Sequence, residues 1–216
     1  MNYISKKRWN ESKVVSEECN ENYLTTIERV INDSLDDYPR ILAVRFDLRL
    51  PESNQDDYLD RDLPDSFNRD KLIPKFIESL KSKIKYDLKR KNKKWDRNFK
   101  CQLRYVWCRE KESSNNEHYH VMIIINKNVY RSIGEYHHNG SLSSMIVSAW
   151  ESSLSLDYNQ VKRLVYFPSN CAYVVNYRDS KYEEQYDDLF YRVSYLAKTR
   201  TKNINRYYRS FGCSTR

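Results

Sequence analysis

Apolar and polar positions alternate along this chain with two different periods. Where apolar residues recur every three or four positions we expect amphipathic helices, and these stretches cover residues 21–35, 71–91, 142–156 and 187–198. Where apolar residues alternate with polar ones or form short runs, we expect strands, and these cover residues 40–50, 102–109, 118–125, 163–167 and 172–177. The chain therefore mixes helices with strands throughout its length.

The order of these elements predicts the fold class. A short polar segment, residues 113–116, joins two neighbouring strands and is typical of a β-hairpin. Helices mixed with such hairpins favour an α+β fold, a central antiparallel β-sheet with flanking helices. We expect one compact domain, with a basic N-terminal segment and helix over 1–39 and the sheet within 40–216. The acidic, proline-containing stretch 52–70 is predicted to be a surface loop.

The strand that begins at His118 carries a second histidine, His120, two positions later. Side chains at i and i+2 of a strand point to the same face, and two neutral imidazoles that converge are good metal ligands. The alternative is a pair of ordinary half-exposed histidines. His137 and His138 are adjacent and precede a turn signal, so we interpret them as loop residues.

A carboxylate from the neighbouring strand is expected to complete this metal site. Glu110 continues the strand over 102–109, whereas Glu112 falls further into the turn and is the second choice. Two imidazoles and one carboxylate leave open positions at a divalent metal for substrate oxygens. The alternative is that either glutamate only solvates the hairpin.

A pair of tyrosines four positions apart, Tyr191 and Tyr195, shares one face of the last expected helix, and Lys198 follows one turn later. A tyrosine is a weak nucleophile that needs activation, which a metal-polarised phosphodiester and a nearby lysine would supply. The Tyr-x-x-Lys spacing alone says little, because the chain contains nineteen tyrosines and two further copies of it.

Net charge adds a candidate partner. The chain carries a formal charge of +8 with a pI near 9.1, which favours a polyanion. Two basic runs with interleaved aromatic residues are typical of proteins that bind single-stranded nucleic acid, although a solvated helix face gives the same pattern. The candidate DNA-binding residues are Lys89, Arg90, Lys91, Lys93, Lys94, Trp95, Arg200, Lys202, Arg206 and Arg209.

Location is predicted from what the sequence lacks. No apolar run is long enough to span a membrane and no apolar segment follows the basic N-terminus. Five cysteines, odd in number and widely spaced, are typical of reduced structural thiols. We expect a cytoplasmic protein without a membrane partner.

The order of these motifs resembles a known superfamily. An apolar first strand over 43–51, the histidine pair and the Tyr195–Lys198 motif follow one another as in the HUH endonucleases of rolling-circle replication. More narrowly, the segments 107–120, 190–202 and 209–214 resemble the inovirus (filamentous phage) replication-protein family that includes YagK/YfjJ-type prophage proteins.

This resemblance implies a Rep-like fold, with residues 40–216 as the catalytic domain, and a bound Mg²⁺ or Mn²⁺. It implies that Tyr195 nicks single-stranded DNA at a replication origin, leaving a 5′-phosphotyrosine bond and a free 3′-hydroxyl that primes rolling-circle replication of a phage, prophage or plasmid-like element. Tyr191 is a weaker candidate for a second nucleophile. A host helicase and polymerase are the expected partners, in the cytoplasm of a bacterial host.

Other functions stay open. Relaxases and single-tyrosine transposases use the same chemistry. A non-catalytic DNA-binding replication regulator or prophage remnant would keep the fold without nicking. A single-stranded RNA or DNA binder whose histidine pair is structural would bind without a metal and form no covalent product.

Overall fold

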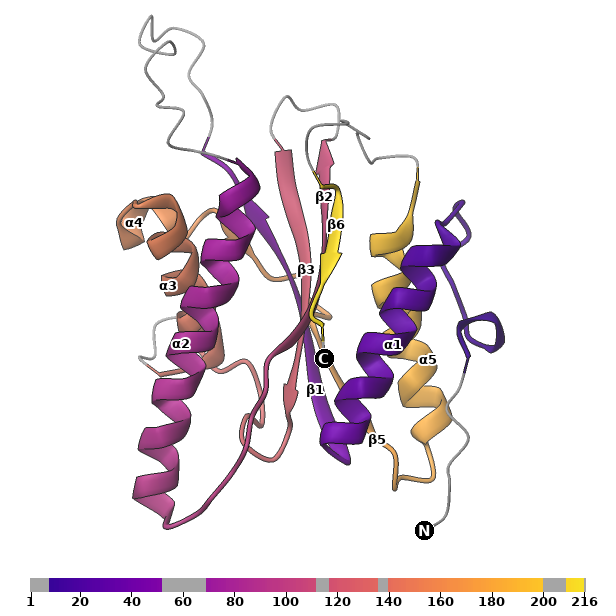
Figure 1. The fold of residues 1–216 in the computed structure, drawn as a ribbon, viewed down its shortest axis with the longest axis horizontal. Helices are drawn as coiled ribbons and strands as arrows, with labels where there is room; N and C mark the ends of the chain where they lie inside the picture. The colour runs from indigo at the N-terminus through magenta and orange to yellow at the C-terminus, as the bar shows by residue number, and fades with distance from the viewer. Residues whose placement is uncertain (1–7, 52–68, 112–116, 136–139, 200–208, 216) are drawn as a thin grey trace, which may run out of the picture.

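The computed structural model describes residues 8–51, 69–111, 117–135, 140–199 and 209–215. A central antiparallel sheet of six strands lies between two layers of helices (Figure 1). The strands are β1 (Arg40–Arg49), β2 (Arg104–Lys111), β3 (Glu117–Asn126), β4 (Val165–Tyr166), β5 (Ala172–Asn176) and β6 (Phe211–Cys213). The helices are α1 (Glu21–Asp37), α2 (Arg69–Trp95), α3 (Leu142–Leu154), α4 (Tyr158–Val161) and α5 (Tyr182–Ser194). The short 3₁₀ turns among the described residues are η1 (Trp9–Glu11) and η3 (Tyr195–Ala197). The predicted α+β class and central antiparallel sheet are confirmed.

The strands lie in the order β4-β1-β3-β2-β6, and β5 also pairs with β1. β4 and β5 therefore share one edge of β1: Tyr166 pairs with Asp47 and Ala172 pairs with Val44. β2 and β3 form the expected hairpin, with Arg104 opposite Ile124 and Glu110 opposite His118. β1 and β3 are consequently central strands, covered on both faces.

Alternation along the strands supplies two separate cores. On β1 the residues Leu42, Val44, Phe46 and Leu48 join the core beneath α2 and α3, whereas Ile41 and Ala43 join the core beneath α1 and α5. Figure 1 shows the same division, with α2, α3 and α4 on one side of the sheet and α1 and α5 on the other. β3 follows the same rule, so His118 and His120 share the α1/α5 face with Met122 and Ile124.

The ends of several elements differ from the sequence expectation. The helix expected over 187–198 begins at Tyr182 and ends at Ser194, and the residues after it form η3. The helix expected over 71–91 extends from Arg69 to Trp95. Residues 52–68 of the predicted loop and the histidines at 137 and 138 lie outside the described residues. No helix in the described ranges combines the length and apolar character needed to cross a membrane.

Candidate functional site

The histidine pair lies where three adjacent strands bring polar side chains to one face of the sheet. β1 and β2 flank β3 on its two sides, and the register places Asp47 and Cys108 opposite His120, and Glu110 opposite His118. These residues belong to the face covered by α1 and α5, because each is separated by an even number of positions from a residue of that core. The strand pairing thus assembles the site from segments far apart in the sequence.

The predicted metal ligands form one cluster. Ligand atoms of Glu110, His118 and His120 all lie within 4.8 Å of one another. The two histidine Nε2 atoms are 3.1 Å apart, and the Nε2 atom of His120 is 3.3 Å from Oε2 of Glu110. Two nitrogens bound about 2.1 Å from one ion at a right angle lie about 3 Å apart. The donor set therefore fits a divalent cation in both spacing and chemistry.

A second carboxylate orients His120 from the opposite side of its ring. The Nδ1 atom of His120 lies 2.7 Å from Oδ1 of Asp47, and the guanidinium of Arg45 pairs with the same oxygen at 3.2 Å. With the Nδ1 proton donated to Asp47, the lone pair of Nε2 faces Glu110 and His118. A carboxylate behind a histidine in this way is the usual support of a metal-binding imidazole.

Protonation of the Asp47–His120 pair follows from these contacts. Burial disfavours the imidazolium form of His120, but hydrogen bonds to Asp47 and Glu110 outweigh it and raise the His120 pKa above its ordinary value. Burial also works against a charged Asp47, yet the hydrogen bond and charge of His120 lower the Asp47 pKa. Both shifts favour the charged forms of the two side chains, and a cation bound at Nε2 would require that nitrogen to be deprotonated.

Tyr195 lies at the edge of this cluster. Its ring stands edge-on to that of His120, with centroids 5.3 Å apart and an interplanar angle of 83°. The Cζ atom of Arg45 lies 5.3 Å from the centre of the Tyr195 ring, and the Nζ atom of Lys198 lies 3.8 Å from it. In a 3₁₀ turn residues three apart align, and η3 begins at Tyr195. That geometry explains how the Tyr-x-x-Lys spacing brings the two side chains together.

An extended segment before α1 holds this turn in place, and we call residues 17–20 the N-terminal strap. Cys19 and Lys198 form a β-bridge, and the Asn20 amide donates to the Ala197 carbonyl at 2.8 Å. The Thr199 amide donates to the Glu18 carbonyl at 3.0 Å, and Lys198 forms an ion pair with Glu17. The position of Lys198 thus depends on a segment about 180 residues away in the sequence.

The remaining predicted site residues lie elsewhere. Tyr191 is 50% exposed, and no contact among the described residues joins it to the cluster. Arg209 is exposed just before β6. Glu112, Arg200, Lys202 and Arg206 lie outside the described residues. The basic run of α2 lies on the other helical layer: Lys89, Arg90, Lys91, Lys93, Lys94 and Trp95.

Two residues of the site were missed by the sequence analysis. Arg45 and Asp47 are charged, lie two positions apart in a strand whose other interior residues are apolar, and are both buried. Charged side chains are rarely buried without a partner. Two of them inside an apolar strand are therefore a sequence signal of a buried polar site. It indicates a polar site on one face of β1, although only the strand pairing shows that the partner is His120.

Comparison with known proteins identifies the family. The YagK/YfjJ C-terminal domain family matches residues 5–214 of the chain. The chain is 34% identical over 197 residues to the uncharacterized protein YfjJ of Escherichia coli strain K12, covering 89% of this chain and 93% of that protein. It is 33% identical over 194 residues to the uncharacterized protein YagK of the same strain, covering 89% and 91% respectively. No solved structure matches the chain. The chain therefore belongs to the YagK/YfjJ C-terminal domain family.

Proposed function

We propose that this member of the YagK/YfjJ family is an HUH-type tyrosine endonuclease that nicks and rejoins single-stranded DNA. Its role would be to initiate rolling-circle replication of a phage, prophage or plasmid-like element. The observation that supports the proposal is one arrangement: a tyrosine against a cluster of two histidines and one glutamate, with two cations over its ring.

Glu110, His118 and His120 would hold Mg²⁺ or Mn²⁺, and such an ion supplies Lewis-acid polarisation of a phosphodiester. The Tyr195 hydroxyl loses its proton to water as its oxygen attacks phosphorus. The bond from phosphorus to the 3′ oxygen breaks, and that oxygen takes up a proton from water. The products are a 5′-phosphotyrosine bond and a free 3′-hydroxyl, and attack by a 3′-hydroxyl reverses the reaction. Arg45 and Lys198 lie beside the Tyr195 ring, where they stabilise negative charge on the tyrosine oxygen and the phosphate.

The proposal implies single-stranded origin DNA as the substrate and a host helicase and polymerase as partners, in the cytoplasm of a bacterial host. In this proposal Tyr191 is not needed for the first nick. That side chain lies one turn before Tyr195 and is half exposed, so Tyr191→Phe is the matched control for Tyr195→Phe.

The test is a covalent-adduct assay. The protein is incubated with labelled single-stranded oligonucleotides tiled across the DNA that flanks its gene, with Mn²⁺ or with EDTA, and the products are separated by denaturing electrophoresis. We expect an adduct with Mn²⁺ from wild type and from Tyr191→Phe, and none from Tyr195→Phe. Oligonucleotide binding by Tyr195→Phe should stay close to that of wild type.

Replacement of His118 or His120 by Ala should reduce Mn²⁺ affinity and cleavage together. An adduct formed by Tyr195→Phe, or nicking that survives both histidine replacements, would place the reaction centre elsewhere. Binding that is independent of metal, with no adduct from any oligonucleotide in a wider pool, would instead favour a non-catalytic DNA-binding regulator on this fold.

A further inference from the structure

The basic charge of this protein is concentrated in α2. The helix contains eleven Lys and Arg residues and three Asp and Glu residues, an excess of eight positive charges. The whole chain has 38 basic and 30 acidic residues, the same excess. The rest of the chain therefore has equal numbers of basic and acidic residues. A polyanion attracted by the net charge should accordingly approach α2 first.

One face of α2 presents cations around an exposed ring. We call Lys75, Lys83, Tyr86, Arg90 and Lys93 the α2 stripe; the four cations lie eleven and three positions before Tyr86 and four and seven positions after it. These spacings place all five on one side of a helix. Tyr86 is 75% exposed, so its ring is accessible to a ligand.

Internal ion pairs use little of this charge. Among the described residues Asp87 is buried and pairs with Arg90 and Lys91, at 2.7 Å each. Glu78 pairs with Lys81 at 2.8 Å. No salt bridge within the described residues engages Lys75, Lys83 or Lys93. An ordinary solvated helix is stabilised by many pairs of opposite charge, and α2 has few carboxylates with which to form them.

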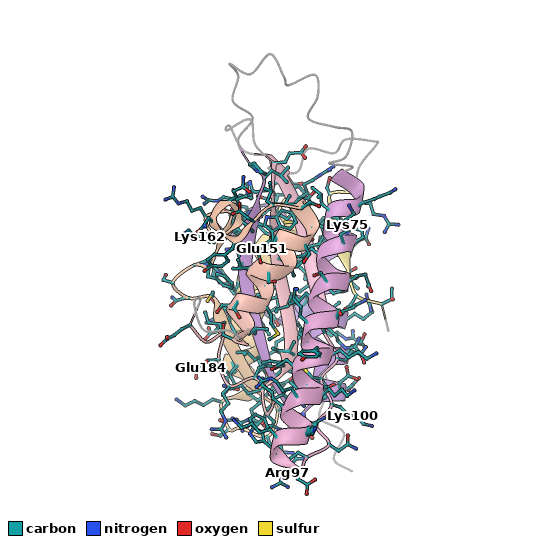
Figure 2. All side chains as sticks on the ribbon, turned by 90° about the vertical axis from the view of Figure 1, so that its left-hand side faces the viewer. Lys75, Arg97, Lys100, Glu151, Lys162 and Glu184 are labelled. Carbon is teal, nitrogen blue, oxygen red and sulfur yellow. The ribbon has the colours of Figure 1, made fainter. Side chains whose placement is uncertain are left out.

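A groove lies beside the stripe, between α2 and the α3–α4 segment, with a volume of about 880 Å³. The stripe lines it with Lys83, Tyr86 and Arg90, and the other wall contributes Ser144, Ser148 and Tyr158. Figure 2 looks onto this face, with Lys75 and Arg97 at opposite ends of the α2 region and Glu151 on the neighbouring α3. Cations, hydroxyls and two tyrosine rings thus line one hollow, together with Met145 and the carboxylates of Asp87 and Glu151. The Asp87 carboxylate is already paired with Arg90 and Lys91.

This surface is separate from the candidate reaction centre. α2 packs on the core formed by Leu72, Phe76 and Leu80, whereas the histidine cluster lies on the opposite face of the sheet with α1 and α5. A nucleotide held in the groove cannot at the same time contact Tyr195, because the whole sheet lies between them.

We propose that the α2 stripe and its groove form a second binding site, for single-stranded DNA. Cations hold the phosphate backbone while bases stack on exposed aromatic rings, the combination that proteins use for single strands without sequence preference. Lys75 and Lys93 lie about 27 Å apart along the helix axis at 1.5 Å per residue, room for several nucleotides. The groove holds a strand at a place other than the one where it would be cut, so the proposal stands whether or not the protein nicks DNA.

The test measures binding where nicking plays no part. Fluorescence anisotropy of a labelled oligothymidylate of about twelve nucleotides is followed in EDTA, with Tyr195→Phe as the background. Tyr86→Ala should weaken binding about tenfold through lost stacking, and Tyr86→Phe, which keeps the ring, should bind like its background. Melting temperatures of these variants should agree, because the side chain is exposed.

Salt dependence tests the cations. Each phosphate contact to a single strand contributes about 0.7 to the slope of log affinity against log salt, so Lys83→Gln with Lys93→Gln should lower that slope by about 1.4. The matched control neutralises two exposed lysines on the other helical layer, Lys13→Gln with Lys181→Gln, and should leave the slope unchanged.

Three outcomes would overturn the proposal. Tyr86→Ala and Tyr86→Phe could bind equally, showing that no base stacks there. Duplex DNA could compete as well as the single strand, showing a backbone contact to duplex. The slope of log affinity against log salt could stay unchanged when the stripe lysines are neutralised. An acidic protein would then be the better candidate for the groove.

Discussion

Asp47 contacts His120 at Nδ1, on the side of the ring away from the other candidate metal ligands, and so determines how His120 is presented. Its Oδ1 atom lies 2.7 Å from Nδ1 of His120 and also pairs with the guanidinium of Arg45. Two of these three side chains, His120 and Arg45, also lie beside Tyr195. Asp47 is therefore a positioning residue, which acts on the proposed reaction through the imidazole that it orients.

We predict that Asp47→Asn lowers Mn²⁺ affinity by about 10- to 100-fold, as loss of a carboxylate behind a metal-binding histidine usually does. Isothermal titration calorimetry measures the affinity directly and needs no nicking activity. Asp188→Asn, an exposed carboxylate on α5, is the control and should leave Mn²⁺ affinity unchanged. Unaltered affinity in Asp47→Asn would contradict the positioning role of the Asp47 carboxylate.

At the scale of elements, α2 is fixed to the loop after β3 by one buried carboxylate. Tyr130 donates its hydroxyl proton to Asp87 at 2.9 Å, and Arg90 and Lys91 hold the same carboxylate. Lys91 also lies over the Tyr130 ring at 3.8 Å. Arg90 and Lys91 of the predicted DNA-binding run therefore have a structural task in addition to any contact with nucleic acid.

This carboxylate should make stability depend on pH in the acid range. Burial would raise the Asp87 pKa, but hydrogen bonds from Lys91, Arg90 and Tyr130 outweigh it, so the folded-state pKa lies below 3.8. A depressed pKa stabilises the folded state above the unfolded value, and that contribution is lost as pH falls below 3.8 through the folded pKa. Urea unfolding across this range should show a shallower pH dependence for Asp87→Asn than for wild type. Equal slopes would contradict the assignment.

The elements also show which features could be predicted from the sequence. The i, i+2 relation of His118 and His120 depends only on local strand geometry, and the apolar spacing of α1, α2 and α3 depends only on the helical repeat. The end of α5 at Ser194 could not be predicted, because the N-terminal strap that holds η3 is a long-range contact. Asp47 was missed for a related reason: its partner follows from strand pairing and register, which no local pattern reveals.

At the scale of the whole molecule, the sheet separates two surfaces with different properties. The α1/α5 face carries the histidine cluster and Tyr195, and the α2/α3 face carries the groove and the strongly basic helix α2. A single strand that engages both would have to pass around an edge of the sheet. Figure 1 shows how completely the sheet divides the two helical layers.

Because of this separation, changes on the two faces should act independently. For binding of a single strand long enough to engage both faces in Mn²⁺, the free-energy effects of Tyr86→Ala and Asp47→Asn should add within about 0.5 kcal/mol in the double variant. A double-mutant cycle by fluorescence anisotropy measures this. A larger coupling energy would indicate that the two faces communicate through the sheet, which the packing of two separate cores gives no reason to expect.

The double-sided burial of β3 has a consequence at the level of the gene. One face of this strand carries His118, His120 and Met122, and the other carries Tyr119 and Val121 in the opposite core. Loss or gain of a single codon within β3 would exchange the two faces, driving imidazoles into an apolar core and removing them from Glu110. In sequences of this family, insertions and deletions should therefore occur between strands and be absent within β3.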